Sequence, residues 1–254
     1  MNFAKSLLAH HRLIHTILHE AKREMLVVYN AADKATPPKD KQKDPNYFQP
    51  ETISEILDKL ESEPLKWRLI THLLIVTGCR RGEIMGLKWE KIDFNTNQIR
   101  IDTALKYLPK VGTYEGSTKT GNTRTLYLPD ETMQLLKQHR HDCLELRLKN
   151  GDRWKETGYV FIRDDGSPMN PDSIGSWLSD FAKRHDLPHI NPHAFRHTVA
   201  SVLIANGTDV VTVSKQLGHH KISTTEDFYS HLIEQNKEKA ADCIAATLLR
   251  RKQA

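Results

Sequence analysis

Apolar residues along the chain fall mostly at helical spacing, and strand-like alternation is confined to short segments in the middle. Leucines and isoleucines recurring three or four positions apart predict amphipathic or buried helices. Short runs that alternate around turn-forming residues predict strands. The pattern therefore predicts a mainly α chain with a small antiparallel β-sheet, an α+β fold. We expect helices near 7–30, 53–60, 65–76, 83–87, 130–148, 171–184, 193–206, 210–217 and 234–249, and strands near 91–94, 98–101, 104–108, 124–128 and 160–162.

The composition changes after the first predicted helix. Residues 33–47 hold three prolines and several lysines but almost no aliphatic side chains, which is typical of an extended linker. We therefore expect a helical unit over 1–32, a basic Pro-containing linker over 33–47 and a larger domain over 48–254. One helix cannot bury its apolar face alone, so the first unit is interpreted as part of a larger helical domain, or as a segment that needs DNA or another chain.

Charge and cysteine content narrow the classes of function without selecting one. Lys and Arg number 37 against 32 acidic residues, giving a net charge of +5 and a pI near 9.0, which is compatible with nucleic acid but common elsewhere. The apolar runs are too short to span a bilayer and the N-terminus lacks a secretory pattern, so a cytoplasmic protein with no membrane partner is expected. Three widely spaced cysteines predict buried thiols.

The last third of the chain contains residue types suited to phosphate chemistry. His193 and Arg196 stand three positions apart at the start of an apolar helix and therefore share a face. His219 follows the end of the next predicted helix, and Tyr229 lies ten positions further on. A phenol, two imidazoles and a guanidinium can attack and hold a phosphodiester without any metal. Each motif by itself has a simpler explanation, such as a capped helix end or a surface arginine.

Two upstream residues complete the set. Arg80 comes directly after a predicted helix that Gly78 ends, and Glu83 either orients this arginine or merely continues the next helix. Lys119 stands in a Gly- and Thr-rich turn before a predicted strand, where its side chain can reach away from the sheet. A second arginine and an acid for a leaving oxygen are therefore available.

Taken in order, five strings resemble the catalytic domain of the tyrosine recombinases, the phage-integrase family. The resemblance covers roughly 46–235, and residues 1–30 resemble the end of the helical core-binding domain that precedes the catalytic domain in this family. Two interpretations stay open: the chain is a fragment of an integrase, or it is an unusually short member. The strings are TGCRRGEIMGLKW, STKTGNTRTLYLP, PHAFRHT, QLGHHKISTT and EDFYSHL.

The resemblance implies the identity of the nucleophile. Tyr229 would attack a scissile DNA phosphate and form a 3′-phosphotyrosine, and a base such as His193 would take its proton. Many members place the tyrosine one residue nearer the LGH histidine, which would select Phe228. Members that end in TxDxYxH select Tyr229 instead, and Asp227, Ser230 and His231 fit that register.

The resemblance also implies roles for the other four residues. Arg80 and Arg196 would hold the two non-bridging oxygens of the phosphate by bidentate hydrogen bonds. Lys119 would protonate the departing 5′-oxygen, and His219 would donate a further hydrogen bond to the phosphate. The implied reaction needs no metal, ATP or other cofactor.

The activity implied is site-specific recombination of double-stranded DNA by a tetramer, in the cytoplasm and at the nucleoid of a prokaryotic cell. The C-terminal helix would dock either on a neighbouring protomer or within its own chain. A type IB topoisomerase and a DNA-binding fragment without full recombination activity are the alternatives. A metal nuclease built on His219, His220 and His231 is disfavoured, because no matching set of carboxylates accompanies them.

Overall fold

A computed structural model of the chain describes residues 3–37, 47–117, 121, 123–219, 221–223, 225–226 and 229–230. The chain divides into two compact units, Met1–Asp44 and Pro45–Ala254. In the parts described, no helix combines the length and the apolar character needed to cross a membrane.

The first unit is a helix with a short turn folded back on it. Helix α1 (Phe3–Arg23) ends earlier than the predicted boundary near Asn30, and the 3-10 turn η1 (Ala31–Lys34) follows. The prediction was wrong here because the chain turns at Met25, which adopts the left-handed conformation (φ 56°), and the N–H of Leu26 donates to the carbonyl of Ala21 (2.8 Å). Asn30 caps η1: its side chain accepts from the backbone N–H of Ala32 (2.9 Å) and donates to the carbonyl of His15 (3.1 Å). The apolar side chains of Leu13 and Ile17 on α1 stay more than half exposed.

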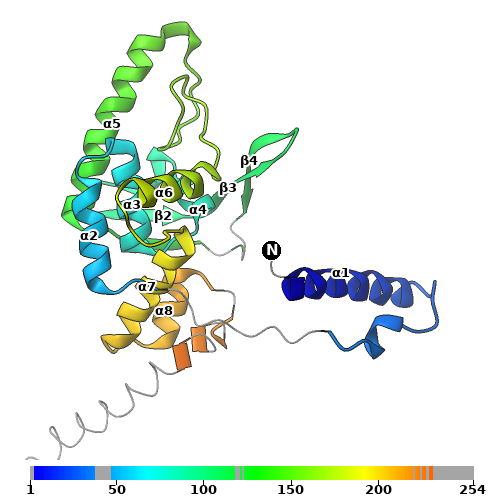
Figure 1. The fold of residues 1–254 in the computed structure, drawn as a ribbon. Coiled ribbons are helices and arrows are strands. Elements are labelled where there is room, and N and C mark those ends of the chain that lie inside the picture. Colours follow the sequence, from blue (N-terminus) through cyan, green and yellow to red (C-terminus); the bar gives the residue numbers. More distant parts are fainter. Residues whose placement is uncertain are drawn as a thin grey trace, which may run out of the picture. The chain divides into compact units, whose positions relative to one another are not determined.

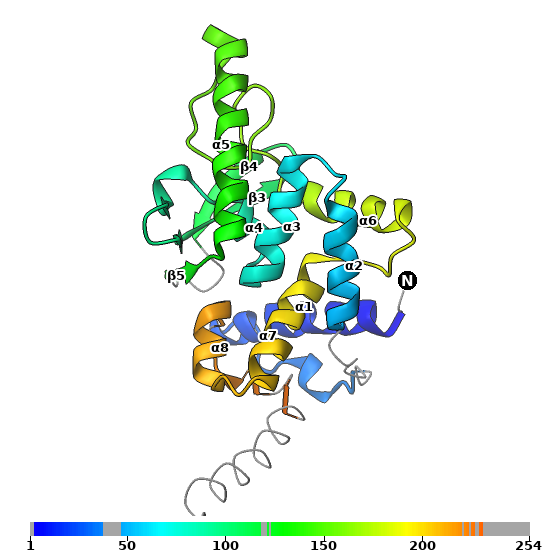
Figure 2. The ribbon, with the colours of Figure 1, turned by 90° about the vertical axis from the view of Figure 1, so that its left-hand side faces the viewer.

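The second unit is built around α3 (Leu65–Thr77), which is buried over most of its surface. Helices α2 (Pro50–Leu60), α5 (Asp130–Asn150) and α7 (Pro192–Ala205) pack against it, as does α4 (Arg81–Met85), the helix that follows it in the chain. Figure 2 shows α3 lying between α2 and α5. The other elements are α6 (Ser173–Arg184), α8 (Val210–Leu217) and the 3-10 turns η2 (Trp89–Lys91) and η3 (Gly151–Arg153). These helices confirm the predicted ones to within a few residues, and the predicted helix over 234–249 lies outside the described residues.

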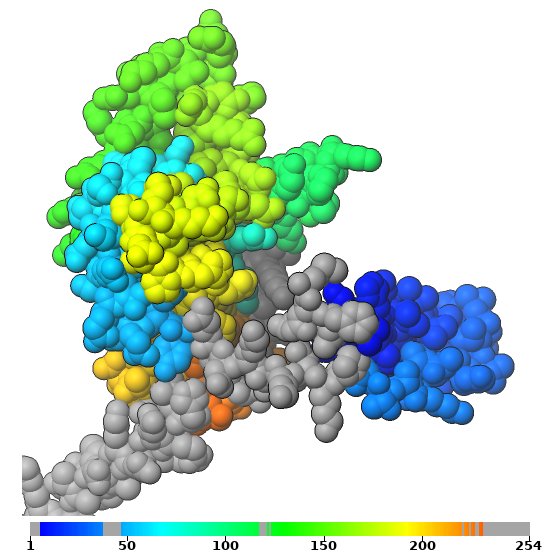
Figure 3. All heavy atoms as spheres, in the orientation of Figure 1, coloured from blue at the N-terminus to red at the C-terminus, as the bar shows by residue number. Residues whose placement is uncertain are grey.

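The strands form two small antiparallel sheets. The hairpin predicted around Asn97 is confirmed, and Asn97 adopts the left-handed conformation (φ 53°) that such turns require. Strands β3 (Thr103–Leu108) and β4 (Gly112–Ser117) form an arm that projects from the body of this unit (Figures 1 and 3). The three-stranded sheet has the order β1 (Ile92–Asp93), β2 (Gln98–Ile101) and β5 (Arg124–Tyr127), and the second sheet pairs β3 with β4.

Two expectations about strands were wrong. Strand β4 was not predicted, because its sequence GTYEGS lacks aliphatic residues and its partner β3 supplies the pairing. The segment 160–162 is not a strand: Tyr159 and Ile162 form only isolated bridges, to Lys88 and Pro168. Its apolar residues reflect burial in the core rather than a hydrogen-bonded ladder.

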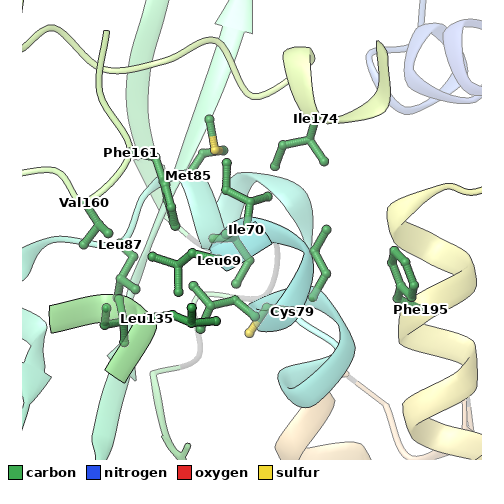
Figure 4. Close-up of a cluster of buried hydrophobic side chains, with 14 of the residues drawn as sticks. Leu69, Ile70, Cys79, Met85, Leu87, Leu135, Val160, Phe161, Ile174 and Phe195 are labelled. Atoms are coloured by element: carbon green, nitrogen blue, oxygen red, sulfur yellow. The ribbon is translucent and has the colours of Figure 1, made fainter. Parts of the chain in front are cut away.

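Two hydrophobic clusters stabilise the second unit. The larger cluster gathers side chains from α3, the strands, α5, α6 and the start of α7 (Figure 4). The smaller cluster joins α7 and α8 and consists of Val199, Ala200, Ile204, Val213, Leu217 and Tyr229. Gly78 ends α3 in the left-handed conformation (φ 61°), and its Cα faces Val199 and Leu217 of the smaller cluster.

Replacing Gly78 with alanine should lower the free energy of unfolding by about 2 kcal/mol or more. The positive φ alone costs a Cβ-bearing residue about 1–2 kcal/mol, and the new Cβ would lie 2.8 Å from Leu217 Cδ2. In α6, Gly175→Ala is the matched control, because a Cβ there meets no atom within 4 Å. We expect that change to be neutral or stabilising by about 0.5–1 kcal/mol. Urea denaturation of both variants checks the difference, and equal midpoints would contradict it.

Candidate active site

Arg80 is held in place by three hydrogen bonds immediately after the turn at Gly78. Its Nη1 donates to Glu83 Oε1 (2.8 Å) and its backbone N–H donates to Glu83 Oε2 (3.1 Å). Its Nη2 donates to the carbonyl of Gly218, the residue that ends α8 (3.1 Å). Glu83 therefore both lies in the first turn of α4 and orients Arg80. The guanidinium is fixed to two helix ends that are distant in the sequence.

Arg196 is buried one turn into α7. The helix begins with Asn191 as its cap and Pro192 in its first turn, and both favour a helix start at this point. Arg196 Nη1 donates to the carbonyl of Gly78 (2.9 Å), and its Nη2 has no hydrogen-bond partner among the described residues. Burial and the charge of Arg80 lower the pKa of Arg196 to about 10, so the group stays cationic at neutral pH. Within the described part of the chain, this buried cation therefore has one nitrogen whose hydrogen bonds are not satisfied.

His193 lies on the exposed start of α7 and faces a cavity. The cavity has a volume of about 490 Å³, and Arg80 and His193 both line it. Its other walls come from α4 and from the β3–β4 arm, including Lys106, Tyr107 and Tyr114. The structure thus brings two of the predicted site residues to one hollow that also carries cationic and aromatic side chains.

His219 follows the left-handed Gly218 at the end of α8. Its Nδ1 is hydrogen-bonded to Thr225 Oγ1 (2.7 Å). Burial, followed by the charges of Arg196 and Arg80, lowers the pKa of His219 to about 4. The imidazole is therefore neutral at pH 7.

Tyr229 is buried rather than presented to solvent. Only 1% of the residue is exposed, and it packs in the smaller hydrophobic cluster with Val199 and Leu217. Its hydroxyl lies 2.5 Å from His197 Nδ1. Burial raises the pKa of Tyr229 well above its usual range, and burial together with the charges of His193 and Arg196 lowers the pKa of His197. A neutral phenol therefore faces a neutral imidazole.

Sequence reasoning did not identify His197. Its one signal in the sequence is its place directly after Arg196 in the string PHAFRHT, whose first histidine and arginine carry the resemblance. Because His197 lies one position beyond Arg196 on α7, it faces a different side of the helix and meets the smaller cluster instead of the cavity.

Arg124, the first residue of β5, was also missed. Its Nη2 donates to Glu83 Oε2 (2.6 Å) and lies 3.2 Å from Cys79 Sγ. Burial disfavours ionisation of Glu83, but the hydrogen bonds and charge of Arg124, together with the hydrogen bonds of Arg80, outweigh it and hold the pKa of Glu83 below its ordinary value. Burial raises the pKa of the Cys79 thiol. The alternating pattern identified Arg124 only as part of a strand.

Lys119 lies outside the described residues, as do His220, Phe228, His231 and Cys243. The other five predicted site residues are described. Arg80, Arg196 and His219 gather around the turns at Gly78 and Gly218, and His193 shares the cavity with Arg80. Across the described ranges, no three His, Cys, Asp or Glu side chains come together as metal ligands.

The chain belongs to the phage integrase family, whose sequence pattern matches residues 46–236. It is 33% identical over 209 residues to a tyrosine recombinase XerC-like protein of Caldanaerobacter subterraneus subsp. tengcongensis, covering 78% of this chain and 53% of that protein. It is 28% identical over 198 residues to the ICEBs1 integrase of Bacillus subtilis (strain 168), covering 77% and 53% of the two chains. The chain thus spans about half the length of these curated relatives.

Solved structures agree with this assignment at the level of the fold. The Tn1549 transposon integrase, in complex with transposon right end DNA, superimposes with a TM-score of 0.76 at 22% identity. The match covers 93% of this chain and 79% of that one. The fold is therefore that of a tyrosine recombinase catalytic domain, as the sequence predicted.

The lowered pKa of His219 predicts a loss of stability in acid. Between its ordinary pKa near 6.5 and the folded value near 4, the unfolded chain binds a proton that the folded chain does not. The free energy of unfolding should therefore fall as the pH drops through this window, by about 1–2 kcal/mol from His219 after allowance for solvent screening. Denaturation at pH 7 and pH 4.5 should show a smaller fall for His219→Gln. The exposed His141→Gln on α5 is the control and should keep the wild-type fall; a wild-type fall in His219→Gln would contradict the prediction.

Proposed function

We propose that this chain acts as a site-specific DNA recombinase or integrase, which cleaves and rejoins DNA through a covalent 3′-phosphotyrosine. The observation that supports this most directly is the convergence of Arg80 and Arg196 on the turns at Gly78 and Gly218, with Arg196 Nη2 buried and unpaired among the residues that the structure describes. Two fixed guanidinium groups are suited to the non-bridging oxygens of a phosphodiester, because their planar forks match that geometry.

In the proposed reaction Tyr229 Oη forms a bond to phosphorus while the bond to the 5′-oxygen breaks. His193 takes the proton of the phenol, and Lys119 gives a proton to the departing 5′-oxygen. Arg80, Arg196 and His219 stabilise the charge on the phosphate in the transition state. The Tyr229 hydroxyl is hydrogen-bonded to His197 Nδ1 within a buried cluster, so attack on DNA requires Tyr229 to leave this contact.

The partners follow from this chemistry. Double-stranded DNA is the proposed substrate, and exchange between two duplexes calls for assembly of the protein into a tetramer on DNA. This activity belongs in the cytoplasm of a prokaryotic cell, at the nucleoid. Residues 1–32 are proposed to be part of a core-binding domain, joined by the basic linker over 33–47 to the catalytic domain over 48–254.

Two alternative functions would use the same site. A type IB topoisomerase-like enzyme would relax a supercoiled plasmid without exchanging partners, whereas a recombinase yields products that join two different duplexes. A fragment that only binds DNA would do neither. Plasmid relaxation and a two-duplex joining assay, run on the same preparation, separate the three.

Tyr229→Phe should abolish covalent capture of DNA. With a nicked duplex that carries the ends of the encoding element, the wild type should form an adduct that survives detergent, while the variant lacks the attacking oxygen. Tyr127→Phe is the matched control, because Tyr127 is exposed on β5 and should leave the yield unchanged. An adduct formed by Tyr229→Phe would assign the nucleophile to another residue.

A chelator distinguishes the tyrosine mechanism from that of a metal nuclease. The tyrosine mechanism requires no metal, so adduct yield should be the same with and without EDTA. A yield that EDTA removes and Mg²⁺ or Zn²⁺ restores would favour metal chemistry over the proposed reaction.

Lys119→Ala should slow cleavage by about 10²–10⁴-fold, the usual contribution of a general acid. A substrate with sulfur in place of the 5′-bridging oxygen needs no protonation on departure, so it should restore most of the rate to this variant. Lys106→Ala, which removes another lysine near the cavity, should show no preference for the sulfur substrate. If sulfur gives Lys119→Ala no advantage over wild type, Lys119 is not the acid.

A further inference from the structure

We propose that Arg124 is a positioning residue for the recombination reaction: it aligns Arg80, through Glu83, with the Gly218–His219 turn. This inference rests on the proposed function of the site. Arg124 is outside the set of residues that the family resemblance selected, and its role follows from its contacts.

The first contact is with Glu83. The side chain of Arg124 is 8% exposed, and its Nη2 donates to Glu83 Oε2 at 2.6 Å. The other oxygen of the same carboxylate, Oε1, accepts from Arg80 Nη1 at 2.8 Å. Glu83 is therefore a bridge between two guanidinium groups, and Arg124 sets the orientation in which its carboxylate meets Arg80.

The second contact is with the turn that ends α8. A Cβ placed on Gly218 would lie 2.7 Å from Arg124 Nη1 and 3.1 Å from its Cζ, so the guanidinium lies directly against this glycine. The carbonyl of Gly218 accepts from Arg80 Nη2 at 3.1 Å, and His219 is the next residue. One side chain from β5 thus supports both parts of the structure to which Arg80 is bound.

The charge of Arg124 also acts on the site. It contributes to lowering the pKa of Arg196 and of His219. Its Nε and Nη1 have no hydrogen-bond partner among the described residues, although both atoms are buried. Burying a third guanidinium beside two others costs stability, and the hydrogen bond to Glu83 offsets only part of this cost. We attribute its presence to the alignment of the two elements to which Arg80 is bound.

The test is the rate of covalent adduct formation by Arg124→Lys. Lysine keeps the charge, but one ammonium cannot make the contacts that the planar group makes to Glu83, Cys79 and Gly218. We expect a 10- to 100-fold slower rate, with DNA affinity within twofold of wild type, because Arg124 is buried. Arg100→Lys, an exposed arginine on the neighbouring strand β2, should leave the rate unchanged.

A neutral substrate separates alignment from general stability. A methylphosphonate at the scissile position removes one negative charge, so the reaction depends less on aligned arginines. The rate difference between wild type and Arg124→Lys should shrink to within threefold on this substrate. A difference that is the same on both substrates would assign Arg124 a purely structural role and overturn the proposal.

One further variant keeps the proposal testable if Arg124→Lys folds poorly, and a double variant tests whether Arg124 acts through Glu83. Gly218→Ala leaves Arg124 in the chain but displaces its guanidinium, so it should show the same slow rate and the same recovery on methylphosphonate. Adding Glu83→Gln to Arg124→Lys should slow the reaction no further than the slower single variant, because both act through Arg80. Multiplied effects would show that Arg124 contacts the phosphate itself and would overturn the positioning role.

The outcomes also distinguish this inference from the proposed function. If the wild type forms no adduct with any element-end duplex, the proposed function fails. If the wild type is active and Arg124→Lys cleaves at the same rate, only the role of Arg124 is wrong.

Discussion

A single buried carboxylate, that of Glu83, holds the charged centre of this protein together. Arg80 and Arg124 both donate to it, and Arg196 lies close enough for the charge of Arg80 to lower its pKa. Guanidinium groups at such proximity repel one another, and burial makes the repulsion stronger. Glu83 offsets part of this cost. The positive charge that remains is the physical reason why the site is suited to a phosphate.

Backbone carbonyls at two helix ends supply the other acceptors. Gly78 ends α3 and Gly218 ends α8, and both adopt the left-handed conformation that turns the chain sharply. Their carbonyls accept from Arg196 and Arg80 respectively. Both turns face side chains that leave no room for a Cβ, so close packing and the placement of the arginines depend on the same two glycines. Stability and site geometry are coupled at these positions.

Much of the fold could be predicted from the sequence, because periodicity and helix-ending glycines are local signals. The helix that ends at Gly78 and the hairpin at Asn97 are examples. Five of the six predicted site residues lie in the described part of the chain, and the strings that carry these five come from four separate segments. Arg124 and His197 could not be predicted, because their partners Glu83 and Tyr229 are 41 and 32 positions away in sequence. Strand β4 was missed for a similar reason, since only pairing with β3 defines it.

The burial of Tyr229 has a further consequence if the proposed function holds. Its side chain belongs to the small cluster that joins α7 to α8, and its hydroxyl is held by His197. Under the proposed function, a subunit that meets DNA alone keeps its reactive oxygen inside its own core. The packing that stabilises the domain would thereby also limit nicking of DNA by a subunit that has not assembled with others.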